Sequence, residues 1–133
     1  MEDRKKRARE NHKKGYNCAQ SVLCAYSDVL GIDEEILFRV AEGFGGGMGM
    51  LGTCGAVTGM FMAAGLAKSS GDLSTCSSKT ETMKVIRQLR EAFEAKNQSL
   101  VCRELKGVDT GVPLRSCDGC IEDGVEIVGK ILL

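Results

Sequence analysis

The sequence contains no tryptophan, a single proline and a single histidine, and aromatic residues make up only 5% of its 133 positions. So few aromatic side chains argue against a stacking surface for single-stranded nucleic acid. With His12 as the only imidazole, a buried histidine base and a histidine-rich metal site are both disfavoured. No hydrophobic run approaches the roughly 18 residues of a membrane span, and the basic N-terminus is not followed by the hydrophobic stretch of a secretory signal. We therefore expect a cytoplasmic protein without a membrane or nucleic-acid partner.

The formal net charge of zero conceals an uneven distribution of charge. Residues 1–14 hold seven basic and three acidic residues, whereas residues 15–133 hold 11 basic and 15 acidic ones. A basic arm of this kind can contact phosphates, but we interpret residues 1–14 as a basic N-terminal helix or arm that is solvated, frayed and without a partner. The length and the hydrophobic fraction of 43% predict a single folded domain over residues 1–133.

Hydrophobic residues recur at spacings of three and four along most of the chain, which is typical of amphipathic helices. The fold class is therefore all-α, and we predict a compact bundle of about five or six helices around a glycine-rich, apolar central helix. The main predicted helices cover residues 19–30, 34–44, 54–66, 80–98, 100–105 and 121–132. Gly31 and Gly107 are placed to end two of them, and Asp33 to cap another. Residues 54–66 are apolar on nearly every side, which indicates the buried central helix.

Glycines interrupt the helical pattern in one segment, with six of them in residues 43–52. Gly45, Gly46 and Gly47 precede a predicted helix start, as in a phosphate-binding loop. However, no strand comes before them and no Lys-Ser or Lys-Thr follows, so we expect them to allow close approach of a helix or a bound group. Gly55 and Gly59 lie four residues apart, which favours tight helix packing.

Seven cysteines are many for a protein of a reducing compartment, where structural disulfides are rare. Cys18, Cys54, Cys102 and Cys117 each fall near the start of a predicted helix, where free amides and the helix dipole favour a thiolate. We therefore expect them to share one site. Cys24 and Cys76 fit a packing role and a polar linker, respectively.

The sequence from Cys117 to Cys120 forms a CxxC motif. Such a motif in a dithiol oxidoreductase accompanies a βαβ unit, and no strand is predicted here. The second cysteine pair of a zinc ribbon is also missing, so Cys120 is interpreted as a filler of an apolar position. Because Ile121 rather than histidine follows Cys120, no covalently attached haem is expected.

Several segments together resemble a known family. They are GYNCAQSVL at residues 15–23, FGGGMG at 44–49, TCGAVTG at 53–59, CREL at 102–105, and Cys117 followed by VEI at 125–127. In order and spacing they are similar to the C_GCAxxG_C_C family, which is described as redox-active and has a related domain in split-Soret cytochrome c. The resemblance covers about residues 8–132. It implies that Cys18, Cys54, Cys102 and Cys117 are the family's cysteines.

These observations predict a thiol-based redox or electron-transfer protein, and thus a cysteine-dependent oxidoreductase if it is an enzyme. The four family cysteines could bind an iron–sulfur cluster or another soft metal, or cycle between dithiol and disulfide. Gly45, Gly46, Gly47 and Gly55 would leave room for a cofactor or small substrate. The expected binding partner is a small substrate or a redox partner.

Two other functions remain open at this point. A non-catalytic helical module with a structural four-cysteine zinc site is the main alternative, although spacings of 36, 48 and 15 residues differ from the paired ligands usual for zinc. A helical interaction protein could use Met48, Met50, Met60 and Met62 as a soft surface, though methionines are commonly core residues. The glycine-rich interior helix and the methionine-rich loop are compatible with a homodimer.

Overall fold

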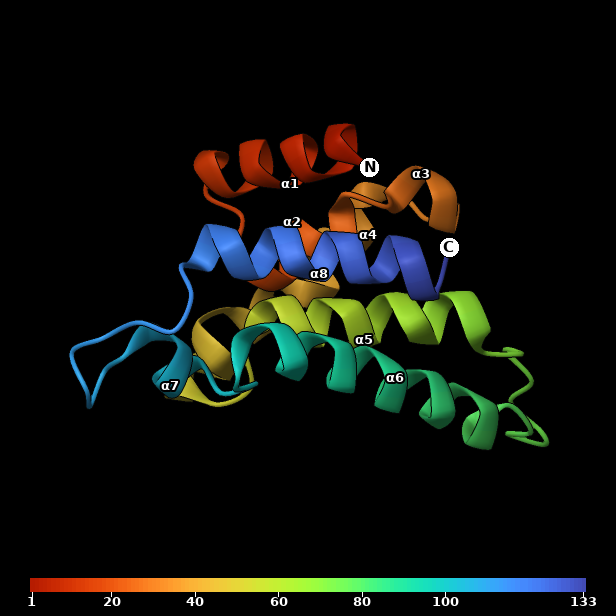
Figure 1. Cartoon of the computed structure of the whole chain (residues 1–133). Helices are drawn as coiled ribbons and strands as arrows, with labels where there is room; N and C mark the ends of the chain where they lie inside the picture. Colours follow the sequence, from red (N-terminus) through yellow and green to blue (C-terminus); the bar gives the residue numbers. More distant parts are fainter.

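The computed structural model describes all 133 residues and contains eight α-helices (Figure 1). The all-α prediction is confirmed, but the number of helices exceeds the expected five or six. The helices are α1 (Glu2–Lys14), α2 (Cys18–Cys24), α3 (Ser27–Leu30), α4 (Glu34–Ala41), α5 (Gly55–Lys68), α6 (Lys79–Asn97), α7 (Cys102–Lys106) and α8 (Cys117–Ile131). A 3₁₀ turn at Glu42–Phe44 and a π-type turn at Gly47–Leu51 connect α4 to α5. No helix combines the length and hydrophobicity needed to cross a membrane.

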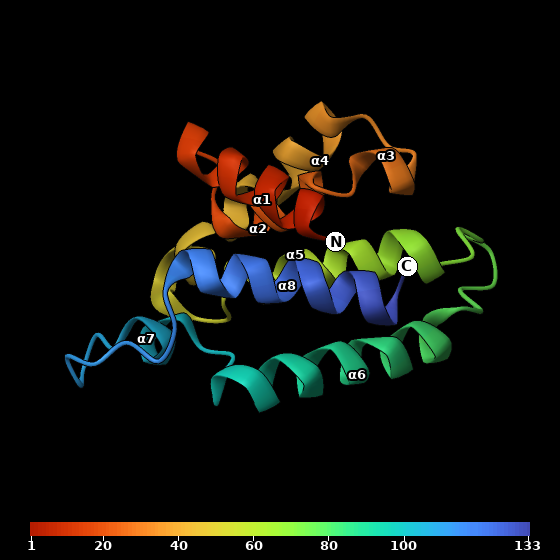
Figure 2. The same ribbon diagram turned by 45° about the horizontal axis from the view of Figure 1, so that its top comes forward.

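Helix α5 forms the centre of the bundle, as its composition predicts. It packs against α2, α6 and α8, and most of its residues are buried. Both views show α5 and α8 side by side and running in the same direction, with α6 running in the opposite direction (Figures 1 and 2). Phe93, Leu23 and Met60 are among the largest fully buried side chains. Removal of this apolar surface from water is the main force that holds the helices together.

Glycines allow α2 and α5 to approach closely. A Cβ atom on Gly59 would lie 3.0 Å from the carbonyl oxygen of Ala19 and 3.2 Å from the Cβ of Val22. A Cβ atom on Gly55 would lie 3.0 Å from the backbone nitrogen of Ala19. The prediction of close packing at Gly55 and Gly59 is therefore confirmed, since any larger side chain at these positions would separate the two helices.

The single helix predicted over residues 19–30 is wrong, because the chain leaves α2 after Cys24 and begins α3 at Ser27. Tyr26 has φ −114° and ψ 15°, outside helical geometry. Its hydroxyl donates a buried hydrogen bond of 2.6 Å to the carbonyl oxygen of Val125 in α8. The long-range bond and the burial of the ring accompany the break, so tertiary packing here overrides the local helical pattern.

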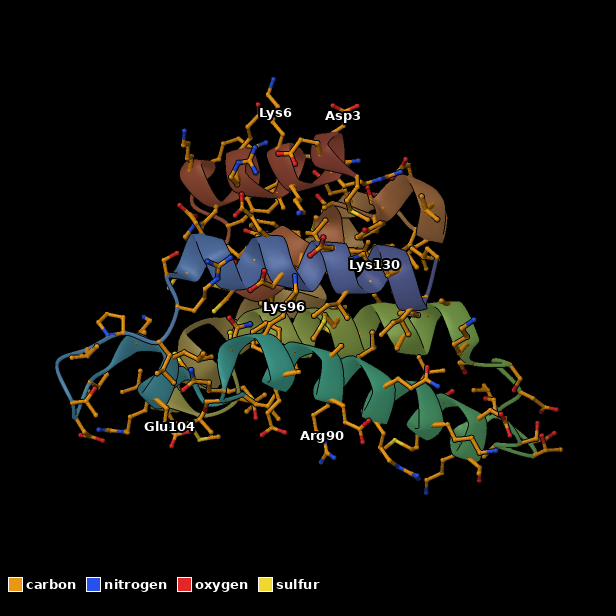
Figure 3. The ribbon with its side chains drawn as sticks, in the orientation of Figure 1. Asp3, Lys6, Arg90, Lys96, Glu104 and Lys130 are labelled. Atoms are coloured by element: carbon orange, nitrogen blue, oxygen red, sulfur yellow. The ribbon has the colours of Figure 1, made fainter.

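Residues 1–14 form the expected basic N-terminal helix, but the expectation that it is frayed and without a partner is wrong. Helix α1 packs against α2 and α8, and its arginines bind acidic side chains elsewhere in the fold. Arg7 lies 3.0 Å from Glu34, while Arg4 forms an ion pair with Asp28. Lys6 and Asp3 point outward from the exposed face of α1 (Figure 3). Much of the basic charge of this segment is therefore used within the molecule.

Helix α6 is amphipathic as predicted, with Leu89 and Phe93 buried and Met83 about half exposed at 47%. Arg90 projects away from the bundle, whereas Lys96 points towards α8 (Figure 3). The ammonium of Lys96 forms an ion pair with Glu126. This contact joins the end of α6 to the middle of α8, next to the cysteine-bearing end of the bundle.

Candidate functional site

Five cysteines line one cavity of about 40 Å³ at the end of the bundle where α2, α5, α7 and α8 begin. They are Cys18, Cys54, Cys102, Cys117 and Cys120. A water molecule needs roughly 10–15 Å³ of such volume. The cavity therefore has space for about three or four atoms the size of a water oxygen, and a larger molecule can meet the sulfurs only from the rim.

Four of these cysteines occupy equivalent positions in their helices, as the sequence predicts. Cys18, Cys102 and Cys117 are the first residues of α2, α7 and α8, and Cys54 is the N-cap of α5. In each case the sulfur lies at the helix N-terminus, where the positive end of the helix dipole and the first-turn amides are located. Both features favour a thiolate over a thiol.

Local capping interactions fix where two of these helices start. The side chain of Asn17 accepts a hydrogen bond from the backbone of Gln20, and the side chain of Gln20 accepts one from the backbone of Asn17, both at 2.8 Å. This reciprocal capping box places Cys18 at the first position of α2. The hydroxyl of Ser116 accepts a 3.0 Å hydrogen bond from the backbone of Gly119 and so places Cys117 at the start of α8.

A short antiparallel bridge brings the starts of α5 and α7 together. Thr53 pairs with Val101. The backbone N–H of Cys54 donates to the carbonyl of Leu100 at 2.7 Å, and that of Cys102 donates to the carbonyl of Gly52 at 2.6 Å. These two bonds hold cysteines that are 48 residues apart in the sequence at the same cavity.

The glycines predicted to surround the site fall into two groups. Gly46, Gly47 and Gly55 line the cavity. Gly47 has φ +61°, and a Cβ atom there would lie 2.9 Å from the Cβ of Cys102. Gly45 is not among the lining residues, and a Cβ atom there would instead lie 2.8 Å from the Cβ of Asn17. Gly45 therefore makes room for the cap of α2 rather than for an occupant of the cavity.

Positive charge surrounds the rim of the cavity. Lys106 and Arg115 are both lining residues, and the guanidinium of Arg115 is held by Asp123 at 3.2 Å. His12, on α1, lies with its Nδ1 atom 2.7 Å from the carboxylate of Asp118. The only histidine is therefore near the site, although it does not line the cavity.

Cys18 and Cys117 form the more accessible pair of thiols, and both are only partly buried. The neighbouring side chain of Cys18, followed by Lys106 and His12, lowers the pKa of Cys117 to about 6. The pKa of Cys18 is raised by the same interaction and by burial. At neutral pH the coupled pair therefore shares one negative charge, which the neighbouring Lys106 favours on Cys117.

Cys54 and Cys120 form a second pair, which is almost completely buried at 5% and 2% exposure. The side chain of Cys120 lowers the pKa of Cys54, and the first-turn amides of Ala56 and Val57 act in the same direction. The pKa of Cys120 is raised by Cys54 and by burial. Cys54 is therefore the thiol of this pair that loses its proton more easily.

Cys102 is the fifth thiol and has no partner thiol of this kind. Burial raises its pKa, and the charge of Lys106 opposes the effect. Cys24 lies outside the cavity, buried in the core, where burial raises its pKa to about 11. Cys76 is exposed in the loop between α5 and α6. These two cysteines fit the packing and linker roles predicted for them.

Cys120 is the lining residue that the sequence interpretation missed. It belongs to the hydrophobic core, as a filler would, but it also faces Cys54 at the cavity. The CxxC spacing was the available signal, because residues three apart on a helix lie on the same side.

No three histidine, cysteine, aspartate or glutamate side chains are arranged so that they could hold a metal ion. The thiols are soft donors that suit zinc or an iron–sulfur cluster, but four of the five form two pairs and Cys102 has no partner thiol. Metal ligation by Cys18, Cys54, Cys102 and Cys117 therefore stays a prediction.

A family model described as "Putative redox-active protein (C_GCAxxG_C_C)" matches residues 16–131. Since the match covers most of the chain, the protein belongs to the C_GCAxxG_C_C family. No curated protein and no solved structure matches the chain significantly.

Proposed function

We propose that this protein is a thiol–disulfide oxidoreductase in which Cys117 attacks a substrate disulfide and Cys18 completes the reaction. The observation that carries the proposal is the paired, partly accessible arrangement of Cys18 and Cys117 at the rim of the cavity. Membership of a redox-active family agrees with it. The substrate class is a disulfide, presented by a small molecule or by a redox partner protein.

Cys117 supports the first step because it is a thiolate at neutral pH and is accessible. Its sulfur attacks one sulfur of the substrate disulfide, the substrate S–S bond breaks, and one substrate thiolate leaves. The product is a mixed disulfide between Cys117 and the remaining half of the substrate. Lys106 provides positive charge next to the leaving thiolate.

Cys18 supports the second step because its protonation depends on the charge of Cys117. Once Cys117 is in the mixed disulfide, that negative charge is gone and the Cys18 proton can pass to the departing thiolate. The Cys18 sulfur then attacks the sulfur of Cys117, and the second substrate thiolate leaves. Two electrons pass from the protein to the substrate, and a Cys18–Cys117 disulfide remains.

The test uses the reduced protein and the aromatic disulfide DTNB, whose released thiolate is coloured. All variants are made in the Cys76→Ser protein. Cys76 is exposed in the loop between α5 and α6, and its thiol would otherwise react with DTNB separately from the cavity cysteines. We expect a Cys18–Cys117 link by mass spectrometry. Cys117→Ser should abolish the link, and Cys18→Ser should accumulate the mixed disulfide at Cys117. Folded protein that reacts at Cys117 without ever forming the link would overturn the proposal.

A thiolate-bound metal is the second candidate, favoured by five soft donors around one cavity. Cys18, Cys54, Cys102 and Cys117 are the residues proposed to hold zinc or an iron–sulfur cluster. Metal analysis of protein purified without oxygen distinguishes the two functions. One equivalent of tightly bound metal, together with loss of helical structure in a chelator, would favour the structural site.

A further inference from the structure

The first turn of α8 presents two cysteines to the same cavity, one turn apart. Cys117 faces Cys18 on α2, and Cys120 faces Cys54 at the start of α5. The outer pair, Cys18–Cys117, is partly exposed, and the inner pair, Cys54–Cys120, is buried. Five lining cysteines exceed the two thiols that one disulfide reaction needs, which leaves the inner pair without an assigned role.

Close packing of backbones holds the inner pair in place. Gly124 lies one turn after Cys120, and a Cβ atom on it would lie 3.3 Å from the carbonyl oxygen of Ala56, two residues after Cys54. The start of α5 is equally close to the start of α2, since a Cβ atom on Gly55 would lie 3.0 Å from the Cβ of Cys18. Cys54 is therefore adjacent to the outer pair as well as to Cys120.

We infer that Cys54 and Cys120 form a second redox dithiol, which receives the disulfide from Cys18–Cys117 by internal exchange and gives the site a capacity of four electrons. The inference rests on the proposed function of the outer pair. It assigns a chemical role to Cys120, and it makes Cys54 the link between the two pairs.

The exchange proceeds in two balanced steps. The Cys54 thiolate attacks the Cys18 sulfur of the outer disulfide, the Cys18–Cys117 bond breaks, and Cys117 leaves as a thiolate. The Cys120 sulfur then attacks the Cys54 sulfur of the new Cys18–Cys54 bond, Cys18 leaves, and the Cys120 proton passes to it. No electrons are gained or lost overall. The disulfide has moved inward, and the outer dithiol can reduce a second substrate disulfide.

The charges around the cavity favour this direction of the first step. The pKa of Cys54 is lowered, so Cys54 is the thiol of the inner pair that loses its proton first, and its charge raises the pKa of the adjacent Cys18. Cys117 is the better leaving group of the outer disulfide because its pKa is low, and thiols of low pKa leave faster. Burial of Cys54 and Cys120 keeps an external disulfide from reaching the inner pair directly.

The experiment uses DTNB, which is too large for a cavity of about 40 Å³, with the reduced Cys76→Ser protein. We expect an excess of DTNB to release about four coloured thiolates per chain, since each disulfide formed releases two. Mass spectrometry should find Cys18–Cys117 early and Cys54–Cys120 later. In the Cys76→Ser, Cys120→Ser protein, the inner link cannot form, and the release should fall from about four to about two coloured thiolates per chain.

Each result has a defined meaning. An outer link with Cys54 and Cys120 still reduced after prolonged reaction would overturn the inference and leave the proposed function intact. A Cys54–Cys120 link in the Cys76→Ser, Cys18→Ser, Cys117→Ser protein would overturn the exchange route, because the inner pair would then be oxidised without any outer thiol. If the Cys18–Cys117 link does not form in the Cys76→Ser protein, the proposed function itself is refuted. Circular dichroism confirms that every variant compared is folded, and Cys120→Ala replaces Cys120→Ser if the latter is not.

Discussion

Two alanine substitutions in α5 separate helix propensity from close packing. Gly59 and Gly65 both lie within α5, but a Cβ atom at Gly59 meets three atoms of α2 between 3.0 and 3.3 Å, whereas one at Gly65 meets nothing within 4 Å. Glycine to alanine in a helix interior gains about 0.8–1 kcal/mol from propensity. Overpacking costs about 1–3 kcal/mol. Gly65→Ala should therefore stabilise by up to about 1 kcal/mol, and Gly59→Ala should be neutral or destabilising by up to about 2 kcal/mol.

Urea unfolding followed by circular dichroism measures this difference directly. The two variants should differ by about 1–3 kcal/mol in free energy of unfolding, which is the overpacking cost alone because propensity cancels. In thermal melts, 1 kcal/mol corresponds to a few degrees, roughly 3–5 °C at this chain length. Gly59→Leu should be more destabilising still. Equal unfolding midpoints for Gly59→Ala and Gly65→Ala would refute the close contact between α2 and α5.

Three further predictions follow from single contacts. The alkylation rate of Cys117 should rise with pH around a midpoint near 6. Lys106→Gln should move that midpoint upward, because Lys106 helps to lower the pKa of Cys117. An unchanged midpoint would contradict the role of this charge. Tyr26→Phe removes the hydroxyl that donates to a buried carbonyl of α8, and should cost about 1 kcal/mol in urea unfolding. Lys96 lowers the pKa of Glu126 to about 2. The stabilisation from this ion pair is therefore complete above the unfolded pKa of about 4.3 and is lost as the pH falls towards 2. Lys96→Met should flatten the pH dependence of the melting temperature between these two values.

Helix starts and helix-capping glycines were predictable because their causes are local. Gly31 and Gly107 adopt the left-handed conformation at the ends of α3 and α7, as glycine at a helix C-terminus favours. Asp33 caps α4 by accepting a hydrogen bond from Glu35. The positions of the four family cysteines at helix starts depend on the same short-range signals.

The features that were not predictable depend on contacts between distant segments. Cys120 faces the cavity because α8 packs on α5 through Gly124. The hydrophobic periodicity of α8 does not reveal this, since a buried cysteine fits the same pattern whether its neighbour is another thiol or a hydrophobic side chain. Docking of α1 depends on acidic partners more than 20 residues away, such as Asp28 and Glu34. Hydrophobic spacing contains no information about such ion pairs.

The parallel course of α5 and α8 affects the reduction potential of the site. Two aligned helices place the positive ends of their dipoles at the same end of the bundle, where Cys54 and Cys117 lie. Thiolates at these positions stabilise the reduced protein, whereas the neutral sulfurs of a disulfide gain nothing from the dipoles. Stabilisation of the dithiolate form shifts a disulfide couple towards a higher, more oxidising potential, by about 30 mV for each 1.4 kcal/mol. For the proposed Cys18–Cys117 couple, the helix directions would therefore make the oxidised form easier to reduce, and the reduced form a milder reductant, than an unstructured peptide with the same cysteines.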